Sequence, residues 1–315
     1  MKAAVIYQYG SPEVLRYEEV ELPKIQPNEV LVKVRASCVN PVDWKIRKGM
    51  LKFITGNKFP MILGFDLSGD VVEVGSQVKL FKPGDAIYGN VGLKGGAYAE
   101  FTVVPETSAA LKPTKMTYEE AASVPVAGLT ALQSLRDLGN IQARQTVLIN
   151  GASGGVGTYA VQIAKALGAE VTGVCSAKNV DLVKSLGADR VIDYTQQDFT
   201  QEIATQYDII LDAVAKQSFS SCQKVLKPHG TYVTTLPSFE SVVQNVLTAI
   251  FPGQKARNVL AIPRTQDLNY LKELSEAGKL KTVIDRTYPL QEIVAAHTYS
   301  ESDRVVGKIA IAIRL

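Results

Sequence analysis

A cluster of glycines between residues 151 and 157 has the composition and spacing of a phosphate-binding turn. It lies in TVLINGASGGVGTYAVQIAKALG, where an apolar run too short for a helix precedes the glycines and a helical pattern follows them, ending at Gly168. This order of strand, turn and helix predicts a pyrophosphate bound by backbone N–H groups at the helix N-terminus. The residues assigned to that contact are Ser153, Gly154, Gly155 and Val156. Because Ala152 replaces the first glycine of G-x-G-x-x-G, an ordinary tight turn is the alternative.

The end of the next predicted strand, EVTGVC, indicates which nicotinamide cofactor is bound. NAD sites carry an Asp or Glu about 20 residues beyond the glycines, where it binds the ribose 2′-hydroxyl. Here the strand ends in Cys175 and Ser176 without a carboxylate, and Lys178 follows. A hydroxyl and an ammonium suit a 2′-phosphate, so we expect NADPH. Alternatively, Lys178 is an ordinary solvated lysine.

Composition limits the classes of protein to consider. The 315 residues suggest two domains, and 46% hydrophobic with 21% charged residues is ordinary for a globular protein. A net charge of +3 without a basic block gives no support to nucleic-acid binding. We recognise neither a signal peptide nor a membrane-spanning run, and we expect a cytoplasmic protein without membrane insertion. Three widely spaced cysteines favour buried thiols over disulfides.

Residues 1–121 have the pattern of a β-rich domain. Val30, Val32 and Val34 alternate with more polar residues, which predicts a half-buried strand. Three further predicted strands are LSGDVVEVG, GDAIYG and AYAEFTVVP. A short helix is predicted over PVDWKIRKG, starting near Pro41 and ending at Gly49.

Residues 122–262 have the rhythm of a parallel sheet. Thr117 and Glu120 form a capping box for a helix that Pro125 then interrupts. Six strands alternating with helices then predict a Rossmann-type doubly wound α/β fold. The predicted strands are VLI, EVTGVC, RVIDY, YDIILDAVA, GTYVTTL and VLAIP, with one of the helices over FTQEIATQ. Residues 263–315 are expected to return to the first domain through two helices, a turn at VIDRTYPL and a closing strand.

Seven segments together carry a family resemblance. They are NPVDWKIRKG, LGFDLSGDVVEVG, FKPGDAIYG, PVAGLTALQSL, ASGGVG, KSLGADRVIDY and KTVIDRTYPL. In this order they resemble the zinc-free quinone oxidoreductase branch of the medium-chain dehydrogenase/reductase superfamily, which includes zeta-crystallin and the plant chloroplast enone/quinone reductases. The resemblance covers essentially the whole chain, and implies a GroES-like catalytic domain beside the Rossmann domain.

The resemblance also implies roles for single residues. Asn40 would contact the nicotinamide or the substrate oxygen, with Asp43 and Lys45 around the nicotinamide ribose. Thr130 would lie under the nicotinamide and Tyr194 at the adenosine phosphate, and Leu236 is also assigned to the cofactor site. Other readings remain open: helix capping for Asn40 and Asp43, a surface position for Lys45, a backbone contact for Thr130 and core packing for Tyr194. An aromatic wall could come from Trp44, Phe53 and Tyr88, or these could be core residues.

Metal binding is not expected. Zinc-dependent members of the superfamily have a Cys at the position of Asn40 and Gly-His-Glu at Gly64-Phe65-Asp66, so the catalytic ligands are missing. The two histidines, His229 and His297, lie in segments where structural or exposed roles are expected.

Without a metal, the predicted chemistry is hydride donation from NADPH to a quinone or to the double bond of an α,β-unsaturated carbonyl. Reduction of an enoyl thioester and cofactor binding without useful turnover, as in a crystallin, are the alternatives. Because the sixth strand would leave an open sheet edge, a homodimer is also expected.

Overall fold

The computed structural model describes residues 1–314, which divide into two compact units. Unit 1 comprises Met1–Ala127, Pro263–Ala277 and the segment 282–314, and unit 2 comprises Gly128–Ile262 and Gly278–Lys281. The boundary at residue 127 falls within helix α4 (Pro125–Leu132). Within residues 1–314, no helix is long and apolar enough to cross a membrane.

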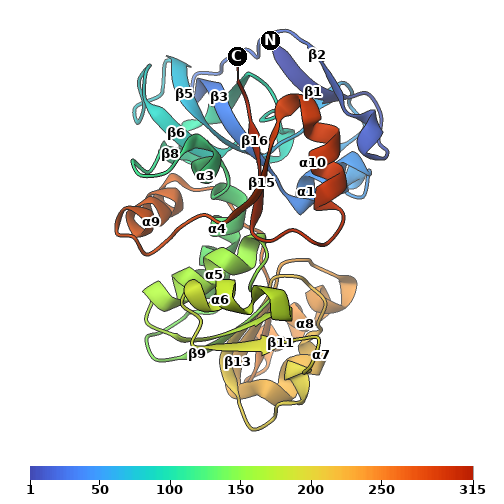
Figure 1. Cartoon of the computed structure of the whole chain (residues 1–315), viewed down its shortest axis with the longest axis vertical. Coiled ribbons are helices and arrows are strands. Elements are labelled where there is room, and N and C mark those ends of the chain that lie inside the picture. The colour runs from blue at the N-terminus through green and yellow to red at the C-terminus, as the bar shows by residue number, and fades with distance from the viewer. Residues whose placement is uncertain (315) are drawn as a thin grey trace. The chain divides into compact units, whose positions relative to one another are not determined.

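Unit 1 contains two largely antiparallel sheets. A three-stranded sheet has the order β2-β1-β4, and a larger sheet has the order β15-β16-β3-β5-β6-β8 with β7 also paired to β3. The bounds are β1 Lys2–Ile6, β2 Arg16–Glu19, β3 Glu29–Val39, β4 Met61–Ile62, β5 Asp66–Val74, β6 Ala86–Asn90, β7 Phe101–Pro105, β8 Ala109–Leu111, β15 Ile284–Pro289 and β16 Lys308–Ala312. Figure 1 shows that the C-terminal strand β16 runs beside β3, near the start of the chain.

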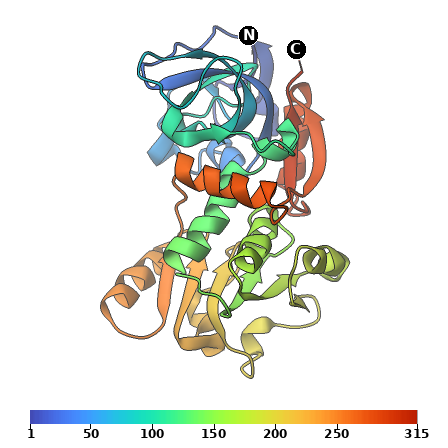
Figure 2. The ribbon, with the colours of Figure 1, turned by 90° about the vertical axis from the view of Figure 1, so that its left-hand side faces the viewer.

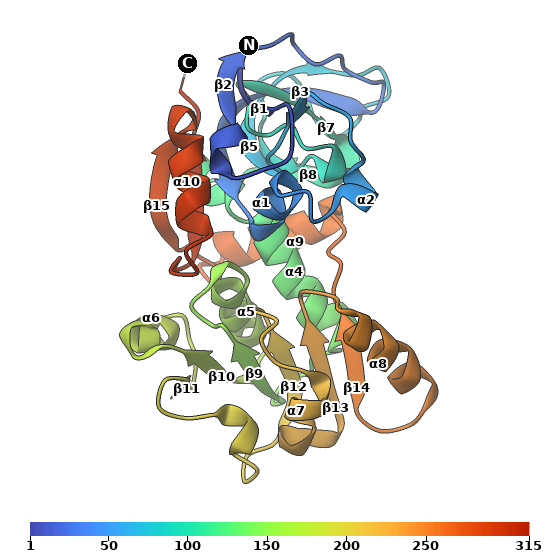
Figure 3. The same ribbon diagram turned by 90° about the vertical axis from the view of Figure 1, so that its right-hand side faces the viewer.

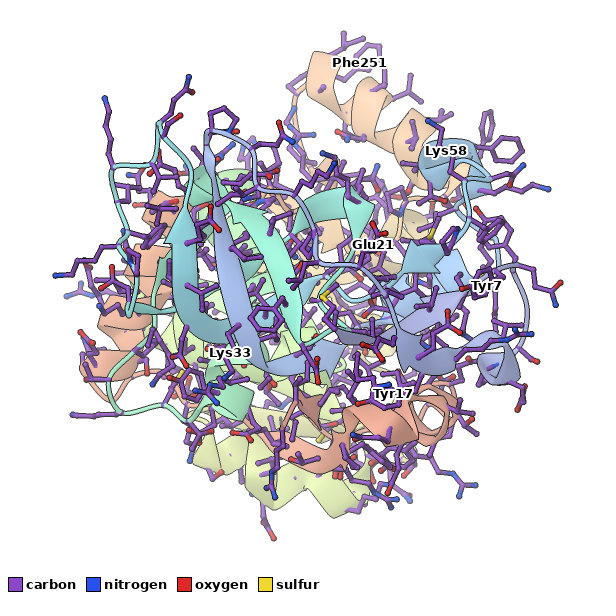
Figure 4. All side chains as sticks on the ribbon, turned by 90° about the horizontal axis from the view of Figure 1, so that it is seen from above. Tyr7, Tyr17, Glu21, Lys33, Lys58 and Phe251 are labelled. Carbon is purple, nitrogen blue, oxygen red and sulfur yellow. The ribbon has the colours of Figure 1, made fainter. Side chains whose placement is uncertain are left out.

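The long strand β3 organises the core of unit 1. Val30, Val32 and Val34 are buried while Leu31 and Lys33 are only partly buried, as the alternation predicts. Figure 4 shows Lys33 on this strand. The buried valines join a core that includes residues of β5, β6, α10 and β16. This core fixes the register of β3, and with it the position of Asn40 directly after the strand.

The helices of unit 1 are short except for α9, the orange-red helix in Figure 2. They are α1 Pro41–Arg47, α2 Lys52–Thr55, α3 Tyr118–Ala122, α9 Thr265–Glu276 and α10 Ile293–Ser300. The predicted capping box is present at α3, where Thr117 Oγ1 accepts the N–H of Glu120 at 3.1 Å and Glu120 accepts the N–H of Thr117 at 2.8 Å. The helix that this box opens ends before Pro125, as predicted, and Pro125 begins α4, because the first helical position needs no N–H donor.

The predicted turn at VIDRTYPL is wrong, because this segment forms strand β15. It pairs in parallel with β16, in a register that places Thr287 opposite Ala310. Most of its residues are partly or fully exposed, as expected for an edge strand. A polar edge strand lacks the alternation of apolar and polar residues that is typical of a half-buried strand. Its extended conformation therefore depends on pairing with the neighbouring strand, here β16.

Unit 2 contains a six-stranded parallel sheet in the order β11-β10-β9-β12-β13-β14, which confirms the Rossmann-type fold. Its strands are β9 Thr146–Asn150, β10 Glu170–Cys175, β11 Arg190–Asp193, β12 Tyr207–Asp212, β13 Leu226–Thr234 and β14 Lys255–Asn258. The helices besides α4 are α5 Gly155–Ala166, α6 Val180–Ser185, α7 Phe219–Cys222 and α8 Phe239–Ile250. Figure 3 shows the strands in this order, with α6 beside β11 and α8 beside β14. All three cysteines are buried and free, as predicted.

Two elements of unit 2 differ from their sequence predictions. The sixth strand is the polar segment at 255–258 and not the apolar VLAIP after it, because β14 is an edge strand whose Lys255 ammonium caps carbonyls at the end of α8. The predicted helix over FTQEIATQ is only a 3₁₀ turn, Phe199–Gln201, closed locally when Asp198 accepts the N–H of Thr200. Helix α8 has no buried residue, and Figure 4 shows exposed Phe251 directly after it.

Candidate active site

The glycine turn leads from β9 into α5, with Gly154 as the N-cap of the helix. Gly154 has no side chain to cap the helix, so the N–H groups of the first turn depend on another acceptor. Helix α5 ends at Ala166. Gly168, at φ 83°, lies two residues beyond it as the predicted C′ glycine. The N-terminus of a helix, with its free N–H groups and the positive end of the helix dipole, favours the binding of phosphate oxygens.

The three-dimensional environments of two glycines differ in an informative way. A Cβ on Gly157 would lie 2.1 Å from the carbonyl oxygen of Gly151, so close packing of the chain itself requires glycine there. A Cβ on Gly154 would lie 3.4 Å from the same oxygen, which is close to an ordinary contact. The protein's own backbone therefore does not require glycine at position 154. The open backbone at Gly154 fits the close approach of a pyrophosphate.

The loop after β10 is tied to this turn by a residue that the sequence analysis missed. Asn179 Nδ2 donates to Ser153 Oγ at 3.0 Å and to Ser176 Oγ at 3.4 Å. One side-chain amide therefore holds two of the predicted cofactor residues together. Lys178, which is exposed, lies in the 3₁₀ turn Ala177–Asn179 of this loop. An Asn four residues after the end of the second strand, in the loop that faces the glycine turn, is the signal that could have indicated it.

Two further predicted cofactor residues lie at the same edge of the sheet. Tyr194 follows β11 and Leu236 lies two residues beyond β13, with 62% and 48% of their surfaces exposed. Parallel strands bring their carboxyl ends to one edge, where Rossmann folds bind ligands. The exposure of Tyr194 rules out the core alternative for this residue. Thr130 is half-buried on α4, outside the sheet.

In unit 1, Asn40 lies at the junction of β3 and α1 and is 1% exposed. It is the N-cap residue of α1, but its side chain makes no capping bond. Instead Nδ2 donates to Asp66 Oδ2 at 3.0 Å and more weakly to Cys38 Sγ at 3.5 Å, while Oδ1 accepts from Lys308 Nζ at 2.5 Å. Asn40 therefore occupies the capping position of α1, in a capping box with Asp43, while three other groups also engage its amide.

Asp66 is the centre of this buried polar cluster. Its two oxygens accept from Asn40 Nδ2, from Asn90 Nδ2 at 2.9 Å and from the backbone N–H of Val126 at 3.1 Å. Burial raises the pKa of Asp66, and the nearby Lys308 ammonium opposes that increase. The cluster consequently holds its members in one arrangement through several simultaneous hydrogen bonds.

Asp43 and Lys45 both lie on α1 but in different environments. Asp43 is fully buried and accepts the N–H of Asn40 at 2.7 Å, so it does cap the helix as the alternative reading held. Burial raises the pKa of Asp43 to about 7. Lys45 is half-buried, its pKa is lowered by burial, and its ammonium lies 5.5 Å from the centre of the Trp44 ring. Lys45 is thus not a plain surface lysine.

The three residues proposed for an aromatic wall differ in how much of each side chain is exposed. Tyr88 is fully buried and donates to the carbonyl of Leu268 at 2.6 Å, so it is a structural residue of unit 1. Phe53 is 93% exposed, and Trp44 is partly buried.

Of the two histidines, His229 is exposed on β13. His297 is fully buried with Nε2 3.3 Å from the Tyr98 hydroxyl, and burial lowers its pKa to about 3.

The donor set around Asn40 does not fit a zinc ion. Burial raises the pKa of the Cys38 thiol, and the nearby Lys308 ammonium opposes that increase. Asp66 is saturated with hydrogen bonds, and the adjacent Lys308 ammonium already supplies a positive charge. Across residues 1–314, no group of three or more His, Cys, Asp or Glu side chains could hold a metal.

Lys308 and Asn90 are further members of the site that the sequence analysis missed. Lys308 is 4% exposed at the start of the closing strand, KIAIA, where it is the one charged residue. A single lysine in an otherwise apolar strand is a signal that could have marked it as buried and paired. Asn90 ends β6 and gives no comparable local signal.

Comparison with known proteins agrees with this architecture. Residues 26–114 match the alcohol dehydrogenase GroES-like domain, and residues 186–311 match the family described as zinc-binding dehydrogenase. The chain is 38% identical over 312 residues to the chloroplast envelope quinone oxidoreductase homolog of Arabidopsis thaliana, covering 96% of this chain and 95% of the relative. It is 36% identical to 2-methylene-furan-3-one reductase of Solanum lycopersicum, covering 99% and 79%.

A solved structure shows the same fold over the whole chain. The quinone oxidoreductase from Coxiella burnetii superposes with a TM-score of 0.91 at 33% identity, covering 100% of this chain and 99% of that one. The chain belongs to the medium-chain dehydrogenase/reductase superfamily, as the seven sequence segments predicted. Within it, the relatives are quinone oxidoreductase homologues and reductases, including the human mitochondrial NAD(P)H oxidoreductase RTN4IP1 at 36% identity. These relatives support an oxidoreductase that uses a nicotinamide cofactor.

Proposed function

We propose that the protein is a zinc-independent, NADPH-dependent reductase of α,β-unsaturated carbonyls or quinones. The observation that carries the proposal is the buried Asn40 cluster, which presents an oriented amide and no metal ligand set. Two relatives are named for quinones and for a 2-methylene-furan-3-one, in which a carbon–carbon double bond is conjugated to a ketone. Such acceptors are already electrophilic and do not need a metal to polarise them.

Some residues of the chain bind the cofactor, and Asn40 stabilises the charge that develops on the acceptor. When bound, NADPH supplies a hydride to the β-carbon of the enone or to the quinone. The backbone N–H groups from Ser153 to Val156 bind the pyrophosphate, and Ser176 and Lys178 hold the 2′-phosphate. Asn40 donates a hydrogen bond to the carbonyl oxygen, where negative charge develops during the reaction.

The preference for NADPH rests on the loop after β10. In this loop Ser176 lies within 3.4 Å of the Asn179 amide, exposed Lys178 is its neighbour, and no carboxylate occupies residues 175–180. An acidic residue here would repel a 2′-phosphate, whereas an ammonium attracts it. Because Lys178 is exposed, its contribution should weaken as salt concentration rises.

The direct test is steady-state oxidation of NADPH and of NADH with a panel of acceptors. The panel contains short enones, long reactive enals, quinones and enoyl thioesters. We expect turnover with an enone or a quinone, at a higher kcat/KM for NADPH than for NADH. Turnover restricted to enoyl thioesters, or binding of NADPH without turnover of any acceptor, would contradict the proposal.

A further inference from the structure

Lys308 is a buried cation that none of the proposed roles explains. It is 4% exposed at the start of β16, and its backbone N–H donates to the carbonyl of Val283 at 2.9 Å. The pairing of Ile309 with Val39 places Lys308 beside the end of β3, where Asn40 follows. Burying an ammonium is costly unless it is well paired, so a specific partner is expected.

That partner is a neutral amide placed between two charges. Lys308 Nζ donates to Asn40 Oδ1 at 2.5 Å, and Asn40 Nδ2 donates to Asp66 Oδ2 at 3.0 Å. The sequence of contacts is therefore ammonium, amide oxygen, amide N–H, carboxylate. Turning the amide over would place its NH₂ against the ammonium and its oxygen against the carboxylate. The two charges consequently permit only one orientation of Asn40.

The fixed orientation leaves one hydrogen of the amide weakly used. The second N–H of Asn40 faces Cys38 Sγ at 3.5 Å, and a thiol sulfur is a poor acceptor. Of the two amide hydrogens it is the one without a strong acceptor. An ammonium bonded to the oxygen of the same amide polarises it and makes its N–H a stronger donor.

We propose that Lys308 is the positioning residue of the reductase reaction: its ammonium fixes the Asn40 amide and strengthens the N–H offered to the carbonyl oxygen of the acceptor. This inference rests on the proposed function, because it assigns Lys308 to the same site. Lys308 acts through Asn40. Removing its charge should therefore weaken the stabilisation of the developing oxyanion more than it weakens binding of the acceptor in the ground state. The contacts proposed for the pyrophosphate and the 2′-phosphate of NADPH belong to unit 2, so the Kd of NADPH should be unaffected.

The test is a double-mutant cycle between Lys308 and Asn40. Lys308→Met keeps most of the side-chain volume and removes the charge, and Asn40→Ala removes the amide. We expect each single variant to lower kcat roughly 10- to 100-fold with little change in the KM of the acceptor. The double variant should be no slower than Asn40→Ala alone, because Lys308 has no other route to the reaction. Lys308→Arg, which retains the charge, should recover part of the kcat.

Lys33→Met is the matched control, since Lys33 is a partly buried lysine on β3 outside the cluster. It should keep kcat, both KM values and the Kd of NADPH. Independent losses that multiply in the double variant, or an unchanged kcat in Lys308→Met, would overturn the inference. An increase in the Kd of NADPH equal to the loss of kcat would also overturn it, because it would show a general structural role.

A second measurement does not depend on turnover or on the Met variant. In a ¹⁵N–¹H correlation spectrum, the Nδ2 resonances of Asn40 are assigned by their loss in Asn40→Ala. We expect them to shift in Lys308→Gln and to stay in place in Lys33→Met. Unshifted resonances in Lys308→Gln would refute the amide contact. A wild-type protein inactive on every acceptor would instead refute the proposed function, whatever the spectrum shows.

Discussion

Gly157 lies against the carbonyl of Gly151, with 2.1 Å between that oxygen and the position a Cβ on Gly157 would occupy. Gly157→Ala should therefore destabilise unit 2 by about 3 kcal/mol or more, because backbone atoms cannot move aside as a flexible side chain could. Thermal or urea unfolding measures the loss. A variant as stable as the wild type would show that the turn can open at this point.

Gly154→Ala is the matched counterpart in the same turn. Its Cβ would lie 3.4 Å from the Gly151 oxygen, so we expect a stable protein with weakened binding of NADPH and NADH alike. Fluorescence quenching gives both dissociation constants. Undiminished affinity for both cofactors would indicate that the pyrophosphate does not approach this backbone.

Lys178→Ala should weaken NADPH binding and leave NADH binding nearly constant, because only NADPH carries a 2′-phosphate. Since Lys178 is exposed, we expect a loss of roughly 10-fold, at the low end for a charge-assisted hydrogen bond, and a smaller loss at high salt. The Kd of each cofactor at two salt concentrations provides the comparison. Equal weakening of both cofactors would assign Lys178 to the loop structure instead.

Asp43 should make the folded state less stable as the pH rises from about 4 to about 7. Its pKa is raised from 3.8 to about 7 by burial, so the folded protein binds this proton more tightly than the unfolded chain does. The free energy of unfolding therefore falls across this window, by an amount on the order of 4 kcal/mol, and is level above it. Asp43→Asn should remove that slope.

The measurement is a series of urea unfolding curves between pH 4 and pH 8, for the wild type and Asp43→Asn. The difference between the two proteins is needed because buried His297, whose pKa is lowered to about 3 by burial, acts in the opposite direction. His297 makes the folded state more stable as the pH rises from 3 to about 6.5. Parallel pH profiles for the two proteins would contradict the assignment to Asp43.

The purified protein should contain no stoichiometric zinc and should keep its activity in a strong chelator. The physical reason is the donor set: a carboxylate that already accepts several hydrogen bonds and an ammonium that lies beside it. Elemental analysis and assays with and without chelator provide the check. About one zinc per chain, or activity lost to the chelator and restored by zinc, would be incompatible with this expectation.

The order of strands and helices, the glycine turn and the capping box at Thr117 could be predicted from the sequence. Each depends on residues close together in the chain: the alternation in β3, the glycines before α5, and Glu120 three residues after Thr117. Such patterns report burial and backbone conformation directly. The parallel order of the strands places Ser153, Ser176, Tyr194 and Leu236, which were assigned to the cofactor from the sequence, at one edge of the sheet.

The polar edge strands β14 and β15 and the Asn40 cluster were decided only by the tertiary structure. An edge strand receives its hydrogen bonds from a partner strand, so its own residues need not alternate. Lys308 and Asn40 are 268 residues apart, and no local pattern brings them together. The pairing of β16 with β3 places the Lys308 ammonium at the Asn40 amide. Both side chains are buried, so water cannot supply a hydrogen bond in place of this contact, and a buried polar group without a partner would be costly.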